Sequence, residues 1–215
     1  MARLITGIDP ARVRENAERI RSELAANAPG EPPQLLAAVK YLPLEELPKL
    51  AEAGVTLVGE NRAQDLEAKA QAHPGAFRWH FIGQLQSRKV KVLLPHVELI
   101  HSVASDSALT QLERHGTPET RILVEVDVAG EEGKAGIAPA DLPAFLERAP
   151  VTVAGLMTMP PYAEDPEASR PYFARLRELA GAHGLTEVSM GTSQDYAVAA
   201  QEGATIVRVG SALYG

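Results

Sequence analysis

The segment EVSMGTSQDYAVAAQEGATIVRVG, residues 187–210, shows the alternation from which the fold class can be inferred. A short, mostly apolar run at Glu187–Gly191 is followed by a helical stretch at Ser193–Glu202 and by a second apolar run at Ile206–Gly210. Strands that alternate with helices indicate β–α–β units, in which the strands are parallel and the crossovers right-handed. The segment therefore predicts two neighbouring parallel strands joined by a helix.

The same alternation extends back through the chain to residue 35. Most of the runs are uninterrupted apolar stretches, which is typical of strands covered on both faces. Eight such units favour closure into a (β/α)8 barrel, although periodicity alone does not separate a barrel from an open, doubly wound sheet. The other predicted strands are Leu35–Lys40, Leu57–Asn61, Trp79–Gly83, Leu99–Val103, Arg121–Val128 and Val153–Met159, and the other clear helices are Ser105–His115, Pro139–Ala149 and Pro166–His183.

An additional helix is predicted before the barrel, at residues 9–27. Asp9 is a candidate N-cap, and Pro10 occupies the first helical position, where proline is favoured. A Pro/Gly break at residues 28–34 follows. We expect a single domain over residues 1–215, with the N-terminal helix in residues 1–30 and the barrel in 35–215. The last unit stops at Gly215, so its helix is expected to be missing or barely begun, with the N-terminal helix covering part of the gap.

Composition narrows the classes of function. The 215 residues are 45% apolar and carry a formal net charge of −7, which favours a soluble protein without a nucleic-acid partner. There is no cysteine, so thiolate metal sites and cysteine catalysis are excluded, and no metal site is expected. No signal peptide and no apolar run long enough to span a membrane are evident, which predicts a cytoplasmic location.

Lys40 is the first candidate functional residue, because it follows five apolar residues at the end of the first predicted strand. In parallel barrels, functional groups gather at the carboxyl ends of the strands. An amine at the inner end of such a strand would lie in a low-dielectric environment that favours its neutral form, and a neutral amine can form a Schiff base with a carbonyl group. From the pattern alone, a lysine that simply reaches solvent is the more frequent case.

Two similar turns, Gly191-Thr192-Ser193 and Gly210-Ser211, follow the last two predicted strands. Loops after strands seven and eight are a common phosphate site in barrels. Helix N-termini offer free N–H groups to an anion, and glycine lets the backbone approach a ligand closely. Ser193 and Ser211 fit helix capping equally well, because capping uses the same geometry.

Arg208 lies two residues before Gly210 on the last predicted strand. With the period of two in a strand, it points to the same side as Gly210 and opposite to Val207 and Val209. An arginine inside a barrel is costly unless a ligand atom or an acidic residue pairs with it, whereas an outward arginine is an ordinary surface charge. Arg208 is therefore a second candidate for ligand binding.

Eight segments together resemble a known family. They are AAVKYLP at 37–43, VGENRAQD at 58–65, WHFIGQLQSRKVK at 79–91, HSVAS at 101–105, EVDVAGEEGKAGI at 125–137, GLMTMPP at 155–161, FARLREL at 173–179 and SMGTSQDYAVAAQEGATIVRVGSALYG at 189–215. In this order the chain resembles the pyridoxal phosphate homeostasis protein family, also known as the YggS-like or proline synthase co-transcribed family. Two departures are Arg88, where the family often has asparagine, and the absence of an Arg-Asp tail after the final glycine.

The resemblance implies a type III pyridoxal phosphate fold, which is the barrel domain of alanine racemase without its second domain. It implies that Lys40 is the Schiff-base lysine and that Arg208 faces the pyridine nitrogen. It further implies that the cofactor phosphate lies at the two glycine–serine turns, and that the remaining site residues line the pocket. The cofactor-binding residues expected on this basis are Lys40, Asn61, His80, Met190, Gly191, Thr192, Ser193, Arg208, Gly210 and Ser211.

The implied function is a carrier or buffer in the intracellular homeostasis of pyridoxal 5′-phosphate, with little turnover. PLP-dependent apo-enzymes are the possible recipients, and the protein is expected to be a monomer with a solvent-open cofactor site. Racemisation needs an acid/base group on each face of the substrate, and no second group is evident in the sequence. The alternatives are a PLP-dependent amino-acid racemase of narrow scope and a Schiff-base aldolase that uses the same lysine without the cofactor.

Overall fold

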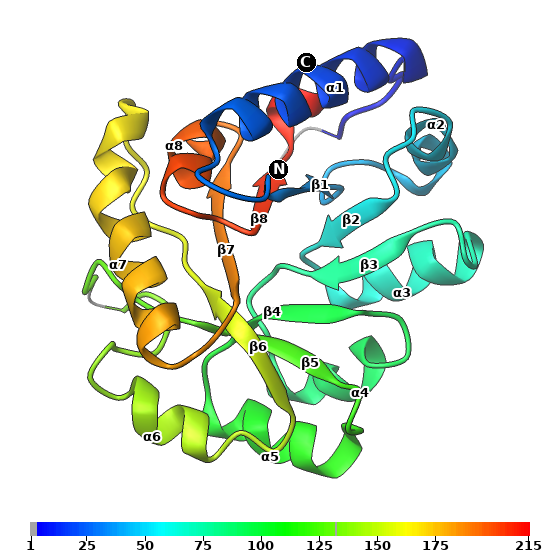
Figure 1. Ribbon diagram of the computed structural model, residues 1–215. Helices are drawn as coiled ribbons and strands as arrows, with labels where there is room; N and C mark the ends of the chain where they lie inside the picture. Colours follow the sequence, from blue (N-terminus) through cyan, green and yellow to red (C-terminus); the bar gives the residue numbers. More distant parts are fainter. Residues whose placement is uncertain (1–3, 132) are drawn as a thin grey trace.

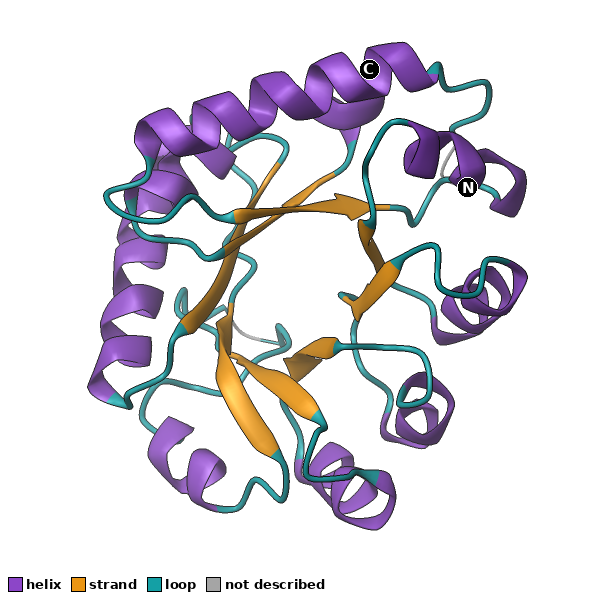
Figure 2. Ribbon diagram, turned by 45° about the vertical axis from the view of Figure 1, so that its right-hand side comes forward, coloured by secondary structure: helices purple, strands orange, loops and turns teal. Residues whose placement is uncertain are grey.

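The computed structural model describes residues 4–131 and 133–215, and its centre is a closed barrel of eight parallel strands. Each strand is hydrogen-bonded to the next along the sequence, and the first pairs with the last, so the barrel prediction is confirmed and an open sheet is excluded. Figure 2 shows the ring of strands surrounded by helices. The strands are β1 (Gln34–Ala38), β2 (Leu57–Glu60), β3 (Arg78–Phe81), β4 (Leu99–Val103), β5 (Arg121–Glu125), β6 (Thr152–Met157), β7 (Glu187–Thr192) and β8 (Ile206–Val209).

Helices connect the strands on the outside of the barrel (Figure 1). Among the described residues, none of them combines the length and apolar character needed to span a bilayer. The α-helices are α1 (Pro10–Asn27), α2 (Leu47–Glu52), α3 (Ala63–Ala72), α4 (Val90–Leu93), α5 (Asp106–His115), α6 (Leu142–Glu147), α7 (Arg170–Ala182), α8 (Tyr196–Gln201) and α9 (Ser211–Tyr214), and the 3-10 helices are η1 (Leu44–Glu46), η2 (Ser87–Lys89) and η3 (Pro166–Ser169).

The strands separate two apolar regions, because alternate side chains of a strand point to opposite faces. The larger region fills the space between the outside of the strands and the helices. The smaller one lies inside the barrel and is formed by Leu36, Leu57, Leu99, Leu123, Met157 and Ile206. Side chains thus fill the interior of the barrel, and polar groups at the carboxyl ends of the strands face the mouth.

Helix α1 covers the side of the barrel next to α9, the short helix that follows β8. Its N-cap Asp9 accepts a hydrogen bond from the backbone N–H of Ala11 at 3.0 Å, as predicted. It packs against α8 and against α9, which has four residues, and the chain ends beside it in Figure 1. The Asn16 amide donates to the carbonyl oxygens of Leu213 and Gly215. The expectation that α1 covers the short last helix is confirmed.

Several strands end earlier than predicted at their carboxyl ends. β1 stops at Ala38 rather than Lys40, β5 at Glu125 rather than Val128, and β6 at Met157 rather than Met159. The residues just beyond leave the hydrogen-bonding ladder and form the turns of the barrel mouth. The apolar runs therefore indicate where strands lie but overestimate their length on the side that carries the polar groups.

Candidate functional site

One cleft at the carboxyl ends of β1, β7 and β8 brings together residues that are far apart in the sequence. Its volume is about 360 Å³, which lies within the range of roughly 300–1,000 Å³ common for small-molecule sites. Of the ten predicted site residues, six line this cleft: Lys40, Thr192, Ser193, Arg208, Gly210 and Ser211. The other residues that line it are Ile5, Ala38, Tyr41, Tyr162, Gln194 and Tyr214.

Lys40 lies in the turn that follows β1 and is exposed, so the expectation of a low-dielectric environment is wrong. The strand ends before it because the backbone bends: Val39 donates to the Gly59 carbonyl at 2.9 Å, and Leu42 donates back to the Val39 carbonyl at 3.0 Å. The Lys40 Nζ atom lies 5.1 Å from the centroid of the Tyr41 ring, a cation–π distance. The amine therefore stands at the mouth of the cleft, above the buried interior.

A buried ion pair fixes the backbone just before Lys40. Lys69 Nζ lies 2.5 Å from Glu60 Oε2 and donates to the Val39 carbonyl at 2.9 Å. The second oxygen of Glu60 accepts the backbone N–H groups of Asn61 and Arg62 at 2.7 and 3.2 Å. Both charges are almost fully buried, so each depends on the other. The pair joins the end of β1 to the end of β2 and orients the turn that carries the candidate amine.

The turns after β7 and β8 are bonded to each other through Ser193. Its Oγ accepts the backbone N–H groups of Gly210 and Ala212 at 2.9 and 3.3 Å. Ser193 therefore caps α9 rather than a helix of its own, while Ser211 is exposed at the start of α9. Asp195 accepts the backbone N–H and the hydroxyl of Thr192 at 2.7 and 3.1 Å. These contacts gather N–H and hydroxyl donors at one end of the cleft.

Gly191 is required by the geometry of the first of these turns. Its φ is +87°, a conformation that L side chains rarely adopt. An added Cβ would also lie 2.5 Å from the Ala199 Cβ, well inside van der Waals contact. The glycine thus lets β7 turn tightly over α8 and present Thr192 and Ser193 to the cleft.

Arg208 is buried inside the barrel and reaches the cleft floor. Val207 and Val209 belong to the outer core, so the period-two prediction for this strand is confirmed. The Arg208 Nη1 donates to Ser189 Oγ at 2.5 Å, and its Nη2 donates to the Thr158 carbonyl at 2.9 Å.

Burial lowers the pKa of Arg208 to about 10, which still leaves it protonated at neutral pH. Burial also raises the pKa of the nearby Glu125 carboxyl, and the positive charge of Arg208 opposes that rise. Arg208 therefore places a fixed positive charge at the inner end of the cleft. Its hydrogen bonds to Ser189 and Thr158 go to neutral groups.

Comparison with known proteins identifies the family. The sequence matches the family described as "Alanine racemase, N-terminal domain" over residues 8–215. It is 41% identical over 196 residues to the pyridoxal phosphate homeostasis protein of Aquifex aeolicus, covering 85% of this chain and 86% of that protein. A protein of the same name from Pseudomonas aeruginosa is 38% identical over 212 residues, covering 93% and 91%. The chain belongs to the pyridoxal phosphate homeostasis protein family.

Solved structures agree with this assignment. The structure of PipY from Synechococcus elongatus with PLP bound superposes with a TM-score of 0.80 at 31% identity, covering 94% of this chain and all of that one. Alanine racemase from Corynebacterium glutamicum superposes with a TM-score of 0.72 at 18% identity, covering this chain fully and 64% of that one. The second likeness shows the barrel fold alone.

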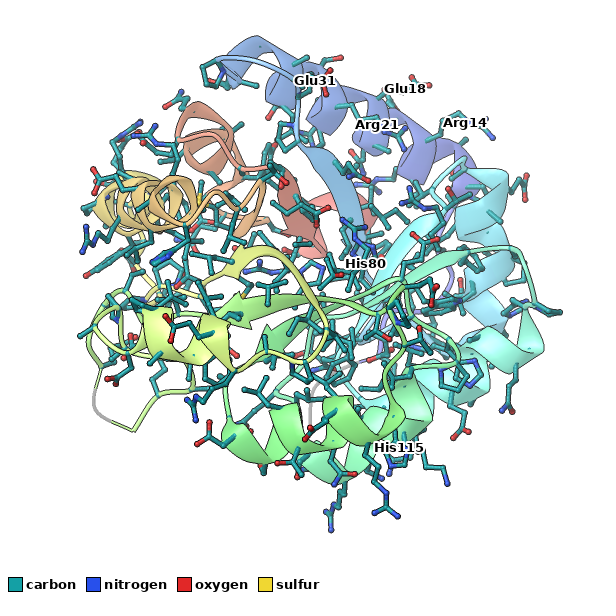
Figure 3. The ribbon with its side chains drawn as sticks, turned by 60° about the horizontal axis from the view of Figure 1, so that its bottom comes forward. Arg14, Glu18, Arg21, Glu31, His80 and His115 are labelled. Atoms are coloured by element: carbon teal, nitrogen blue, oxygen red, sulfur yellow. The ribbon has the colours of Figure 1, made fainter. Side chains whose placement is uncertain are left out.

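Three residues that the family resemblance assigned to the pocket lie elsewhere. Asn61 follows β2 and lines a neighbouring depression with Arg62 and Lys89, and its Oδ1 is buried without a hydrogen-bond partner among the described residues. Met190 points from β7 into the outer core. His80 lies inside the barrel, in the middle of the molecule in Figure 3, and does not line the cleft. Gly191 shapes the cleft without lining it.

Sequence reasoning missed the tyrosines of this family member's cleft. Tyr41 follows Lys40, Tyr162 comes from the loop after β6, and Tyr214 comes from α9. Tyr162 is 82% exposed at the mouth. Tyr214 is partly buried and donates to the Ala38 carbonyl at 3.3 Å, and burial raises the pKa of its hydroxyl. These three positions share no spacing in the sequence. Only the fold shows that they lie at the same cleft.

Proposed function

We propose that this chain binds pyridoxal 5′-phosphate as a Schiff base on Lys40 and acts as a carrier or buffer in the homeostasis of that cofactor. We further propose that residues 1–215 act as one monomeric, cytoplasmic domain. The observation that carries the proposal is the meeting of Lys40, the two glycine–serine turns and Arg208 in one cleft. This arrangement offers an amine, an anion site and a fixed cation to a single small ligand.

The turn end of the cleft fits a phosphate group. The N–H groups of Gly210 and Ala212 converge there on the Ser193 hydroxyl, and a phosphate is a stronger acceptor than a hydroxyl because it is charged. The Ser193 and Ser211 hydroxyls, with these N–H groups, would hold the phosphate. The positive φ of Gly191 keeps a side chain away from the turn.

Arg208 would face the ring nitrogen of the cofactor. Arginine is only a donor, and with a pKa of about 10 it stays charged at neutral pH, so it favours an unprotonated ring nitrogen. A neutral pyridine is a weaker electron sink than a pyridinium, and this disfavours broad carbanion chemistry on the bound cofactor. This property supports a carrier over an efficient catalyst.

The exposure of Lys40 also supports a carrier. Because the amine lies in an exposed turn, a cofactor can reach it and leave it without displacing a packed element. Apo-enzymes that depend on PLP are the class of recipient that such exchange would serve. The tyrosines at the mouth provide aromatic surface on the path that the ligand takes.

A narrow-scope amino-acid racemase is the alternative function, and the cleft tyrosines are the observation that favours it. A racemase needs a second acid/base group besides Lys40. Tyr214 does not suit this use, because its hydroxyl is bonded to a backbone carbonyl and its pKa is raised. Tyr41 and Tyr162 are the remaining candidates. Deuterium exchange at the substrate α-carbon in heavy water, lost in Tyr41→Phe or Tyr162→Phe, would support the racemase.

Borohydride reduction after incubation with PLP, followed by peptide mass mapping, tests the proposal. We expect a pyridoxyl adduct on Lys40 and a visible absorption band in the unreduced protein. Both should be absent in Lys40→Ala and retained in Lys91→Ala, which removes another exposed lysine. A colourless protein without an adduct would refute cofactor binding and favour the aldolase. An adduct on a different lysine would refute the site.

A further inference from the structure

A continuous hydrogen-bonded row of four polar side chains crosses the inside of the barrel. His80 Nδ1 lies 2.9 Å from His101 Nε2, and His101 Nδ1 lies 2.9 Å from Ser189 Oγ. Ser189 Oγ in turn accepts from Arg208 Nη1. The four residues come from β3, β4, β7 and β8 and all are buried. We call them the interior row. It ends at the residue that faces the cleft.

The direction of every hydrogen bond in the interior row follows from Arg208. A guanidinium has donors and no acceptor, so Ser189 Oγ accepts from it. The Ser189 hydroxyl hydrogen is then free to go to His101 Nδ1, which makes that nitrogen an acceptor. The His101 proton therefore sits on Nε2 and is donated to His80 Nδ1. The His80 proton is then also on Nε2.

The opposite direction leaves a buried group unsatisfied. If His101 carried its proton on Nδ1, Ser189 Oγ would accept twice, and its own hydrogen would have no acceptor in the row. An unpaired buried donor is costly. The derived direction gives each of the three hydrogen bonds within the row one donor and one acceptor, and it requires both imidazoles to be neutral. The surroundings agree, because burial lowers the pKa values of His80 and His101, and the charge of Arg208 lowers that of His101 further.

The interior row leaves part of Arg208 available to the cleft. Its three hydrogen bonds within the described residues go to Ser189, to the Thr158 carbonyl and to the Met159 sulfur. A guanidinium has five N–H groups, so two remain for a ligand. Because its two Nη atoms are held by Ser189 of β7 and by the two residues that follow β6, the guanidinium is already ordered before a ligand arrives, which reduces the entropic cost of binding.

We propose that His80, His101 and Ser189 are positioning residues that hold Arg208 toward the cofactor ring through hydrogen bonds of this fixed direction. This inference rests on the proposed function, in which Arg208 faces the ring nitrogen. The row contains no acidic side chain, so no carboxylate in it occupies the guanidinium, and Arg208 keeps its charge at neutral pH because its pKa is about 10. Two neutral imidazoles keep the Ser189 oxygen directed as an acceptor without placing a second positive charge beside the guanidinium.

Nitrogen NMR of the cofactor-free protein, labelled with ¹⁵N in histidine and arginine, tests the direction without reference to PLP. We expect His80 and His101 to be neutral with the proton on Nε2 between about pH 8 and pH 5. In Ser189→Ala, the His101 Nδ1 signal should move to that of a nitrogen without a donor, and the Arg208 side-chain signals should shift. A His101 proton on Nδ1, or Arg208 signals unchanged in Ser189→Ala, would overturn the proposal.

Affinity for PLP supplies the second readout. Loss of a hydrogen bond that orders a charged group should weaken PLP binding by Ser189→Ala roughly ten- to a hundredfold. The matched control is Ser102→Ala, which removes another buried serine hydroxyl that bonds the Gly83 carbonyl outside the row. His80→Gln tests the far end of the row if Ser189→Ala folds poorly. Equal affinity in Ser189→Ala and Ser102→Ala would contradict positioning, whereas absence of any pyridoxyl adduct on Lys40 in the unaltered protein would refute the proposed function alone.

Discussion

Acidification from about pH 8 to about pH 5 should destabilise this fold through His80 and His101. In the folded protein, burial and the charges of Arg78 and Arg121 lower the pKa of His80 to about 3, from an ordinary value of 6.5. The pKa of His101 is also lowered, by burial, by His80 and by Arg208. The unfolded chain takes up protons at both residues below its ordinary pKa, while the folded chain does not. Stability must therefore fall as the pH falls.

The magnitude follows from the pKa of His80. Each pH unit between the folded and unfolded pKa changes the free energy of unfolding by about 1.4 kcal/mol for one group. From pH 6.5 down to pH 5, the His80 contribution is therefore about 2 kcal/mol. His101 contributes in the same direction, because its pKa is also lowered. The His80 contribution alone is already a sizeable part of the roughly 5–15 kcal/mol that stabilises a typical domain.

Urea denaturation at a series of pH values measures this dependence. The window above pH 5 is chosen because ordinary carboxyl groups titrate below it. His80→Gln removes one titrating group, so the slope of unfolding free energy against pH should fall by the His80 share, about 1.4 kcal/mol per pH unit. The control is His183→Gln, in which an exposed histidine is replaced and the slope should stay as in the unaltered protein. A flat profile in the unaltered protein, or an unchanged slope in His80→Gln, would refute the neutrality of the buried pair.

Three substitutions test other parts of the structure. Gly191→Ala should destabilise the fold by on the order of 3 kcal/mol, because it combines an unfavourable φ with a clash against Ala199. Thermal or urea unfolding measures the loss. The control is Gly181→Ala, where an added Cβ meets nothing within 4 Å. Lys69→Met should lower the free energy of unfolding by about 3–5 kcal/mol, because Glu60 is left charged and unpaired. The double variant with Glu60→Gln should recover most of that loss. No recovery would argue against the ion pair as the cause. Glu46 accepts the Gly7 and Ile8 N–H groups and pairs with Lys49, contacts that lower its pKa, so this contribution is present above the unfolded pKa and is lost as the pH falls through the folded value. Glu46→Gln should therefore be less stable than the unaltered protein at neutral pH, and the difference should shrink in acid; a difference that is constant with pH would contradict this.

The strands could be predicted because each one lies in a short run of mostly apolar residues. All eight predicted runs overlap a strand of the barrel. The helices were less visible: α3 has the sequence AQDLEAKAQA, in which Leu66 is the single large apolar residue, so its periodicity is weak. Short helices such as α4 are held by packing against their neighbours more than by their own pattern.

The site was predictable where it depends on strand order and on the period of a strand. It was not predictable where it depends on a local turn or on a contact between neighbouring strands. Ser193, Arg208 and Ser211 follow from strand order and the period of two. The exposure of Lys40 follows from a turn at Val39 that an apolar run does not reveal. His80 and His101 are 21 residues apart and had no spacing that suggested a pair, yet neighbouring strands bring their rings together.

The closure of the barrel links its first strand to its last, and this shapes how the protein can be made. During translation, one edge of β1 has no partner until residues 206–209 of β8 have left the ribosome. The carbonyl acceptors of Asn16 are still later, at residues 213 and 215. A nascent chain with seven strands is an open sheet with two bare edges, the kind of surface that recruits other chains. Closure of the barrel and docking of α1 must therefore wait until residues 206–215 have left the ribosome.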